Sequence, residues 1–467
     1  MNNNITINQN NNNLEDTQDK KVLYKDKDYF NDLNNNSLED YDIRYRELKE
    51  QNGINFDSKY DKYNHIMLSF DDIYLFAKAN DVSKTQYEYI NRVVKALYKY
   101  GFEKPSNVQT IAVFPIINNN DCIVQANSGT GKTATFLLSS MLMVDPLLQD
   151  LQIIIIANTK ELAEQIYTVA CTLFADCEVS FALHVGGFGR QYTKYPNKSY
   201  SNYNEQIVIG TPGKILDLLD KNKLNKSKLH LLVLDEADCL LDDNLLDTTK
   251  DILCNHINTT IKISIFSATL PTNIINLTNK FMKSPIIMTL PEQKVNLKGI
   301  IQYQVDFLNS PKEDVDKDKI DTLIDLLISL NSHVTIVFFN NKKLLDNIYH
   351  TVEDPKYGIN ALCIHGNFDT QTRIDTINKF KDSMKHNVLL CSNVLARGID
   401  IHKISLVINF DIPKKPEDYI HRIGRTGRHG RTGKAINFIT KYNEDDMDII
   451  KKKFDIKLED LPMDLNI

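Results

Sequence analysis

Two apolar segments that each end in polar residues constrain this sequence more than any other feature. The first is Asp121–Thr135, which reads DCIVQANSGTGKTAT, and the second is Leu229–Asp238, which reads LHLLVLDEAD. Near-continuous apolar runs of this length are typical of strands that are buried on both faces of a parallel sheet. Because the first run leads through a glycine-rich turn into a segment of helical character, the pair predicts an α/β domain.

The glycine-rich turn predicts a phosphate-binding loop. Its glycines let backbone N–H groups converge on phosphate oxygens, and the start of the helix behind it favours anions. Lys132 can reach the β and γ phosphates of a nucleotide, and Thr133 can offer its hydroxyl to Mg²⁺. Such loops usually begin with glycine, so a plain turn is the alternative. The candidate nucleotide-binding residues are Ala126, Asn127, Ser128, Gly129, Thr130, Gly131, Lys132 and Thr133.

The acids that end the second segment favour the phosphate loop over the plain turn. Asp235 is a candidate magnesium ligand, and Glu236 beside it is a candidate base. Phosphoryl transfer needs a metal held close to the phosphates and a group that orients the attacking water. The two segments together therefore predict hydrolysis of a nucleoside triphosphate.

The length and charge of the chain leave several partners open. Its 467 residues predict two or three domains. Residues 1–65 hold 13 acidic and 9 basic side chains, so −4 of the net charge of −6 lies there. The remaining −2 is spread over about 400 residues, which leaves room for a locally positive cleft that binds RNA.

The cysteines and the N-terminus predict a reducing intracellular compartment. None of the seven cysteines forms a CxxC pair, which argues against a zinc site and against a disulfide framework. The first residues, MNNNITINQN, lack the pattern of a signal peptide, and no apolar run has the length of a membrane span. We expect a cytoplasmic protein, with a nuclear role left open.

The apolar pattern divides the chain into four parts. Residues 1–65 are rich in asparagine without an apolar period, which predicts a disordered tail or, alternatively, a regulatory arm. Residues 66–290 and 300–467 each alternate strands and helices, and residues 291–299 are the expected linker. The acidic segment Ser310–Asp318 predicts a solvated loop. The expected strands are Cys122–Ala126, Leu151–Ala157, Gln206–Gly210, Leu229–Leu234, Ile261–Phe266, Ile301–Phe307, Val334–Phe339, Asn360–Ile364, Asn387–Cys391, Ser405–Asn409 and Ala435–Thr440.

The segment Tyr419–Arg431, which reads YIHRIGRTGRHGR, is the most basic part of the second unit. It is interpreted as a localisation signal, as a nucleic-acid surface, or as a source of arginines that complete a site in the first unit. Arg422, Arg425 and Arg428 recur at intervals of three residues, which predicts one shared helix face.

Four motifs in order resemble the DEAD-box RNA helicases over residues 66–467. They are GFEKPSNVQ at Gly101–Gln109, DEAD at Asp235–Asp238, SAT at Ser267–Thr269 and HRIGRTGR from His421. Within that family, YGFEKPS, FSATLP and the closing KLEDLPMDLNI are most similar to the translation initiation factor 4A group. The resemblance implies two tandem RecA-like domains, an RNA-stimulated ATPase and the cofactors ATP and Mg²⁺.

The resemblance also implies roles at the nucleotide. Gln109 would read the adenine edge and Asp400 would touch the ribose. Phe70 would stack on the adenine, with Tyr87 as the rival, because residues 71–86 look like an insertion between Phe70 and the GFEKPSNVQ motif. In the same family, Asp235 would hold Mg²⁺ and Glu236 would orient or deprotonate the attacking water. Arg425 and Arg428 would approach the γ phosphate, and His421 would link the motifs of the two domains.

The family contacts RNA through phosphates and 2′-hydroxyls, which makes binding independent of sequence. Helix caps and turns are the alternative explanation for several matching positions. Lys160 and Lys214 stand where the family has arginine, which keeps the charge but loses the planar fork. Thr370 replaces a family glutamine, Asn127 replaces another, and Asn393 resembles the mRNA-export helicase of the nuclear pore. The matching RNA positions are Thr159, Lys160, Gly187, Thr211, Gly213, Arg373 and Ser392.

The resemblance further implies a mechanism and partners. ATP and RNA would bring the two domains together, bend the RNA strand and melt short duplexes, and hydrolysis would release them. A slow RNA clamp or an mRNA-export helicase is the alternative function. The expected partners are RNA and an initiation-factor 4G-like scaffold, and the expected state is a monomer.

Overall fold

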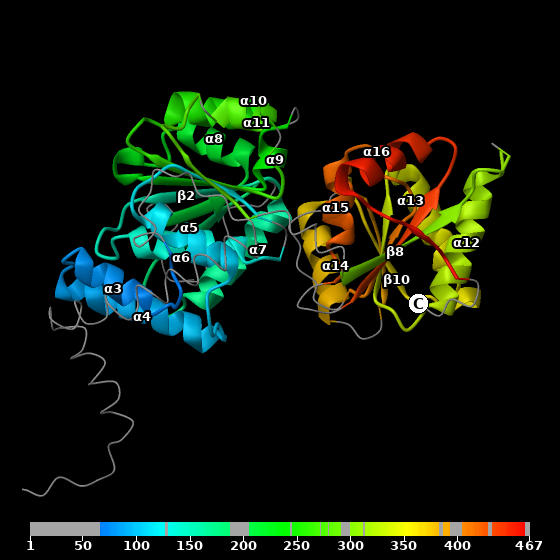
Figure 1. Ribbon diagram of the computed structural model, residues 1–467, viewed down its shortest axis with the longest axis horizontal. Helices are drawn as coiled ribbons and strands as arrows, with labels where there is room; N and C mark the ends of the chain where they lie inside the picture. Colours follow the sequence, from blue (N-terminus) through cyan, green and yellow to red (C-terminus); the bar gives the residue numbers. More distant parts are fainter. Residues whose placement is uncertain are drawn as a thin grey trace, which may run out of the picture.

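The structure is a computed structural model in which two parallel sheets lie side by side (Figure 1). Domain 1 denotes the described residues up to Leu290, and domain 2 denotes those from Gly299 onward. The tail, the linker and several loops lie outside the described residues. The structure describes residues 66–126, 129–186, 205–242, 245–270, 272–278, 280–290, 299–311, 313–382, 386–392, 404–427 and 432–462.

Domain 1 is built on a seven-stranded sheet in the order β3-β4-β2-β5-β6-β1-β7, and all its strand pairs are parallel. Its strands are β1 (Cys122–Gln125), β2 (Ile153–Ala157), β3 (Phe181–His184), β4 (Ile207–Gly210), β5 (Leu231–Asp235), β6 (Lys262–Ser267) and β7 (Ile286–Thr289). Its helices are α3 (Asp72–Ala79), α4 (Lys84–Tyr100), α5 (Asn107–Ile117), α6 (Lys132–Met143), α7 (Lys160–Leu173), α8 (Pro212–Asp220), α9 (Ala237–Leu240), α10 (Leu246–Asp251) and α11 (Thr272–Thr278), with a π-helix at Ile252–His256 and a 3₁₀ turn at Lys226–Lys228.

Domain 2 repeats this architecture, with the order β10-β11-β9-β12-β13-β8-β14 and parallel pairing throughout. Its strands are β8 (Ile300–Asp306), β9 (Thr335–Phe339), β10 (Ala361–Ile364), β11 (Val388–Ser392), β12 (Leu406–Asn409), β13 (Gly433–Ile439) and β14 (Glu459–Asp460). Its helices are α12 (Val315–Ser329), α13 (Lys342–Val352), α14 (Thr370–Asp382), α15 (Pro416–Ile423) and α16 (Glu444–Phe454), with a 3₁₀ turn at Pro355–Tyr357.

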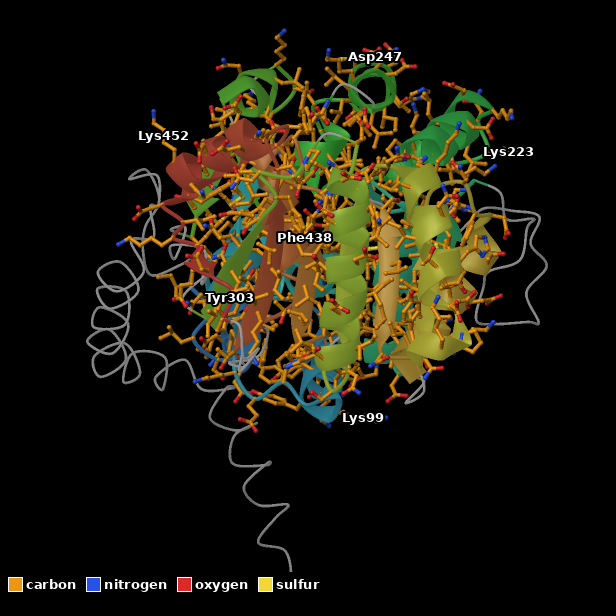
Figure 2. The ribbon with its side chains drawn as sticks, turned by 90° about the vertical axis from the view of Figure 1, so that its right-hand side faces the viewer. Lys99, Lys223, Asp247, Tyr303, Phe438 and Lys452 are labelled. Carbon is orange, nitrogen blue, oxygen red and sulfur yellow. The ribbon has the colours of Figure 1, made fainter. Side chains whose placement is uncertain are left out.

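Both sheets are buried on both faces because most positions of their central strands are apolar. In β2, Ile153 and Ile155 pack under α5, α6 and α7, whereas Ile154 and Ile156 pack under α8 on the opposite face. In domain 2, Phe438 and Tyr303 belong to the core that α12 and α13 cover. Figure 2 shows both aromatic residues on the sheet of domain 2, whereas Lys452 of domain 2 and Lys223 and Asp247 of domain 1 lie at the outline of the molecule. The predicted α/β fold class is confirmed.

Local capping explains where several helices begin. Ser83 accepts a hydrogen bond from the backbone of Gln86 and starts α4, and Asn341 accepts two at the start of α13. Helix α3 occupies the predicted insertion at residues 71–86.

Among the described residues, no helix combines the length and the apolar character that crossing a bilayer requires.

The structure corrects the sequence predictions in two places. The short edge strands β3, β7 and β14 were not predicted, because each is short and none is buried along its whole length. The solvated loop predicted at Ser310–Asp318 is wrong, because α12 already begins at Val315, whose side chain is buried. Asp316 and Asp318 favour this helix start, since acidic groups in a first turn interact well with the helix dipole.

Candidate active site

The glycine-rich turn joins β1 to α6 at the edge where the parallel strands end. The backbone N–H of Ala126 donates to the carbonyl of Ser267 at 2.9 Å, which ties the turn to the end of β6. Gly131 has φ +100°, and a Cβ atom there would lie 2.8 Å from Oγ of Ser106. Glycine is therefore required at this position, both for its backbone angle and for the close approach of α5. Asn127 and Ser128 lie outside the described residues.

Lys132 begins α6 and carries a buried ammonium group. Its side chain is almost wholly enclosed, and Nζ lies 3.9 Å from Oε1 of Glu236. Within the part of the chain that the structure describes, this Nζ has no hydrogen-bond partner. A buried cation at a helix N-terminus without a hydrogen bond fits an anionic ligand such as a phosphate. Thr133 is the next residue of the same turn, where its hydroxyl can serve a metal.

Two buried carboxylates lie at the end of β5, next to the phosphate loop. Asp235 is 3% and Glu236 is 4% exposed. Glu236 has φ +52°, a left-handed backbone that costs energy for a residue with a side chain and is typical of functional sites. Burial raises the pKa of Asp235, and Glu236 raises it further, while Lys132 lowers it. An acid in this setting is suited to a divalent cation, which would offset the burial of its charge.

Asp238 connects three parts of the site. Its backbone N–H donates to Oγ of Ser267 at 3.3 Å, and its Oδ2 accepts from Oγ1 of Thr269 at 3.0 Å. Nε2 of His421, from α15 in domain 2, lies 3.4 Å from the same oxygen. An ion pair between the domains also joins Lys415 to Asp242. The ends of β5 and β6 and the basic segment of domain 2 therefore meet at one carboxylate.

Sequence reasoning assigned no role to Asp238 or Thr269. The available signal was that both motifs follow predicted strands, and β5 and β6 are neighbours in the sheet. Because neighbouring parallel strands end at the same edge, their terminal residues can pair.

The arginines of domain 2 do not share a helix face, so that prediction is wrong. Helix α15 ends at Ile423, before Arg425. Arg422 is fully buried and donates to the carbonyl of Asp411 at 2.6 Å and to Oδ1 of Asn340 at 2.7 Å, and burial lowers its pKa to about 10. It therefore stabilises domain 2 internally. Arg425 is also buried and donates through Nε to the carbonyl of His421 at 3.1 Å.

The candidate adenine-binding residues lie at the start of α5 and before α3. Oε1 of Gln109 accepts from the backbone N–H of Ser106 at 2.8 Å, so Gln109 also caps its own helix. Phe70 is 1% exposed and packs edge-on against Tyr98 and Phe102, with ring centroids 5.9 and 6.2 Å away. Tyr87 is partly exposed, 5.8 Å from the ring of a neighbouring tyrosine. Asp400 and Arg428 lie outside the described residues.

The candidate RNA-binding residues occupy both domains. Oγ1 of Thr159 accepts from the backbone N–H of Leu162 at 3.2 Å and caps α7, so the capping explanation holds for this residue, whatever else it binds. Arg373 of α14 lies 3.1 Å from Oε1 of Glu161 in α7, which makes it a contact between the domains. The other candidates are Lys160 in the first turn of α7, Thr211 and Gly213 at the start of α8, Ser392 at the end of β11, and Gly187, which lies outside the described residues.

Comparisons with known proteins agree with this geometry. The family described as DEAD/DEAH box helicase matches residues 106–277, and the helicase conserved C-terminal domain matches residues 318–430. The chain is 37% identical to ATP-dependent RNA helicase FAL1 of Candida glabrata, over 80% of this chain and 91% of that protein. It is 36% identical to eukaryotic initiation factor 4A of Cryptosporidium parvum, over 79% of this chain and 88% of the relative.

Solved structures give the same result. Dbp5 of S. cerevisiae bound to RNA and ADP BeF3 superposes with a TM-score of 0.72 at 30% identity, covering 85% of this chain and 96% of that chain. Two RecA-like domains, an ATP-binding loop and an RNA-binding family therefore agree with the site described above. The chain belongs to the DEAD-box family of ATP-dependent RNA helicases.

Proposed function

We propose that this helicase melts short RNA duplexes when ATP and RNA bring its two domains together. The observation that carries the proposal is the junction at Asp238, which Thr269 of domain 1 and His421 of domain 2 share. A carboxylate shared in this way links the hydrolytic residues to the position of the other domain. Arg425 follows His421 by four residues and donates through Nε to its carbonyl oxygen.

At the nucleotide, Lys132 would bind the β and γ phosphates, and Glu236 would orient the attacking water and take its proton. Thr133 and Asp235 would hold Mg²⁺, which would neutralise phosphate charge when bound. Arg425 and Arg428 would stabilise the charge that develops on the γ phosphate. Gln109 would read the adenine edge, and Asp400 would touch the ribose.

Two aromatic residues remain candidates for stacking on the adenine. Phe70 matches the family's aromatic in local sequence and packs against Phe102 of the GFEKPSNVQ motif, whereas Tyr87 is partly open to solvent. We favour Phe70, because Tyr87 lies eleven residues before Tyr98 in α4, about 17 Å along the helix and away from the motif that holds Gln109.

The RNA strand would bind through its phosphates and 2′-hydroxyls, without sequence preference. Thr159, Lys160 and Thr211 are at helix starts in domain 1, where backbone N–H groups attract phosphates. Gly187, Gly213, Arg373 and Ser392 complete the proposed surface. Binding across both domains would bend the strand, which a duplex cannot follow.

In the cell, we propose a role in translation initiation, in the cytoplasm, as a monomer that a scaffold like initiation factor 4G recruits. The names of the relatives in Cryptosporidium parvum and Caenorhabditis elegans support this role. The second candidate function is an RNA clamp or an mRNA-export helicase. It is supported by the likeness to Dbp5 bound to RNA and ADP BeF3, with TM-scores of 0.70 and 0.72.

One experiment separates the helicase from the RNA clamp. Unwinding of a short RNA duplex is measured under multiple turnover, together with the lifetime of RNA on the protein in the presence of ATP. A helicase releases RNA within each ATP cycle and unwinds excess duplex. A clamp retains RNA for many times the duration of one turnover and stops after one equivalent.

A further inference from the structure

The contact between α7 of domain 1 and α14 of domain 2 contains a pocket that neither the ATP site nor the proposed RNA surface uses. Figure 1 shows the two helices facing each other between the domains. The pocket has a volume of about 290 Å³ and takes its walls from both domains. The lining residues that matter here are Tyr100, Glu161, Glu164, Val169, Ile374 and Ile377.

Glu161 supplies the innermost charge of this α7–α14 pocket. Its side chain is 3% exposed, and its Oε1 lies 3.1 Å from Nη2 of Arg373. Within the described parts of the chain, neither oxygen of this carboxylate accepts a hydrogen bond of good geometry. Buried carboxylates normally accept several hydrogen bonds, so Glu161 retains acceptor capacity toward the pocket.

Glu164 lies one helical turn further along α7 and also lines the pocket. Burial raises the pKa of Glu164 to about 7, Glu161 and Asp375 raise it as well, and Lys381 lowers it. Of the charged side chains that line the pocket, those of Glu161 and Glu164 are acidic and that of Lys381 is basic. The lining therefore holds one more acidic group than basic groups.

The remaining wall is apolar. Val169, Ile374 and Ile377 present aliphatic side chains, and Tyr100, whose side chain is partly exposed, adds an aromatic ring. A ligand that pairs with the carboxylates and also packs against the apolar wall needs a cationic group and an apolar stem, as alkylammonium and guanidinium compounds have. We propose that the α7–α14 pocket binds an organic cation of this class.

Because the two domains each supply one wall, the pocket exists only when they are in contact. A ligand that binds one arrangement shifts the population toward it. The organic cation would therefore prolong the state that holds ATP and RNA. This consequence rests on the proposed domain closure. The organic cation would be either a free amine or the side chain of a basic residue on a protein partner.

The test is calorimetric titration of hexylammonium chloride into the full-length protein, with and without ADP, beryllium fluoride and a single-stranded RNA oligonucleotide. 1-Hexanol is the uncharged match, and Nα-acetylarginine amide represents a partner's side chain. Hexylammonium or the arginine amide should bind at least about ten-fold more tightly than hexanol. Binding should require the nucleotide and RNA. Titration into RNA alone is subtracted.

The two cations identify the source. Binding of hexylammonium alone indicates a free amine, and binding of the arginine amide indicates a partner's arginine. If neither cation binds more tightly than hexanol, or if binding ignores the nucleotide and RNA, the proposal is overturned. RNA-stimulated ATP hydrolysis without any probe is measured in parallel, so that an inactive preparation is not mistaken for an empty pocket.

Two substitutions are expected to change the affinity for the cation in opposite directions. Glu164→Gln should weaken binding of the cation by about ten-fold, because it removes a charged acceptor. Lys381→Met should strengthen binding, because it removes the competing ammonium. Glu88→Gln, at an exposed position of α4, is the matched control and should change nothing. An unchanged affinity in Glu164→Gln, or a weaker affinity in Lys381→Met, would contradict the proposal.

Discussion

The two domains place a lysine and a carboxylate at matching points of the same sheet topology, yet they use the pair differently. In domain 1, Lys132 follows β1, the first strand in the sequence. Its Nζ lies 3.9 Å from Oε1 of Glu236, which follows β5, the fourth strand in the order of the sheet. In domain 2, Lys319 lies in α12, the helix that follows β8. Its Nζ lies 2.8 Å from Oδ1 of Asp411, which follows β12, again the fourth strand in the order of the sheet. One pair is held apart, and the other is in direct contact.

The surroundings of each pair explain the difference. Lys319 lies over the ring of Phe410 at 4.0 Å, and Oδ2 of Asp411 accepts from the backbone of Asn340 at 2.9 Å. That pair is complete without a ligand. Lys132 has no hydrogen-bond partner within the described residues, so its charge remains available for a phosphate. The same layout therefore serves stability in domain 2 and chemistry in domain 1.

The largest expected effect is on catalysis at Lys132. Lys132→Met should lower ATP turnover by about a hundred-fold or more, because the phosphates lose their charge partner. The free energy of unfolding should change less than in Lys319→Met, since Nζ of Lys132 lies 3.9 Å from Glu236 and makes no hydrogen bond within the described residues. Steady-state ATPase rates and urea unfolding measure the two effects. Loss of stability without loss of activity would contradict the proposed difference between Lys132, which serves catalysis, and Lys319, which serves stability.

The converse substitution in domain 2 should act on stability. Lys319→Met leaves Asp411 without its cation and should cost about 3 kcal/mol in the free energy of unfolding. Urea unfolding measures the loss, with Lys317→Met at an exposed position of the same helix as the control. Equal stability of the two variants would show that the Lys319 pair is not structural.

A smaller effect is expected where the domains meet. His421→Ala should reduce the stimulation of ATP hydrolysis by RNA by about ten-fold, because one link between domain 2 and Asp238 is lost. The RNA-free rate should hardly change. Rates measured with and without saturating RNA separate the two quantities. A uniform decrease in both would assign His421 a role within one domain.

The smallest predicted effect concerns pH. Burial and Glu236 raise the pKa of Asp235, so a proton must leave this carboxyl before Mg²⁺ can bind. The apparent Mg²⁺ affinity in the presence of ATP should therefore fall by about three-fold per unit as the pH is lowered through the raised pKa of about 7, where this carboxyl is half protonated. Magnesium titrations at several pH values check this. In Asp235→Asn the dependence due to this group should vanish.

Sequence reasoning predicted the sheets well, because long apolar strands such as Ile153–Ala157 carry a strong signal. It also brought Lys132 and Asp235 to one edge, since parallel strands end together. It could not predict that Arg422 lies in α15 and Arg425 lies beyond it, because this depends on where the helix ends. The burial of Phe70 likewise depends on how α3 and its neighbours pack, which spacing along the chain does not reveal.

The central claim is that domain 1 holds half of a hydrolytic site and that domain 2 completes it. The most direct test is ATP turnover by the full chain with and without a short RNA duplex, in the wild type and in Arg425→Ala. The wild type should gain at least about ten-fold from RNA, and Arg425→Ala should gain little. A wild-type rate that RNA leaves unchanged, or an Arg425→Ala variant stimulated as strongly as the wild type, would contradict the claim.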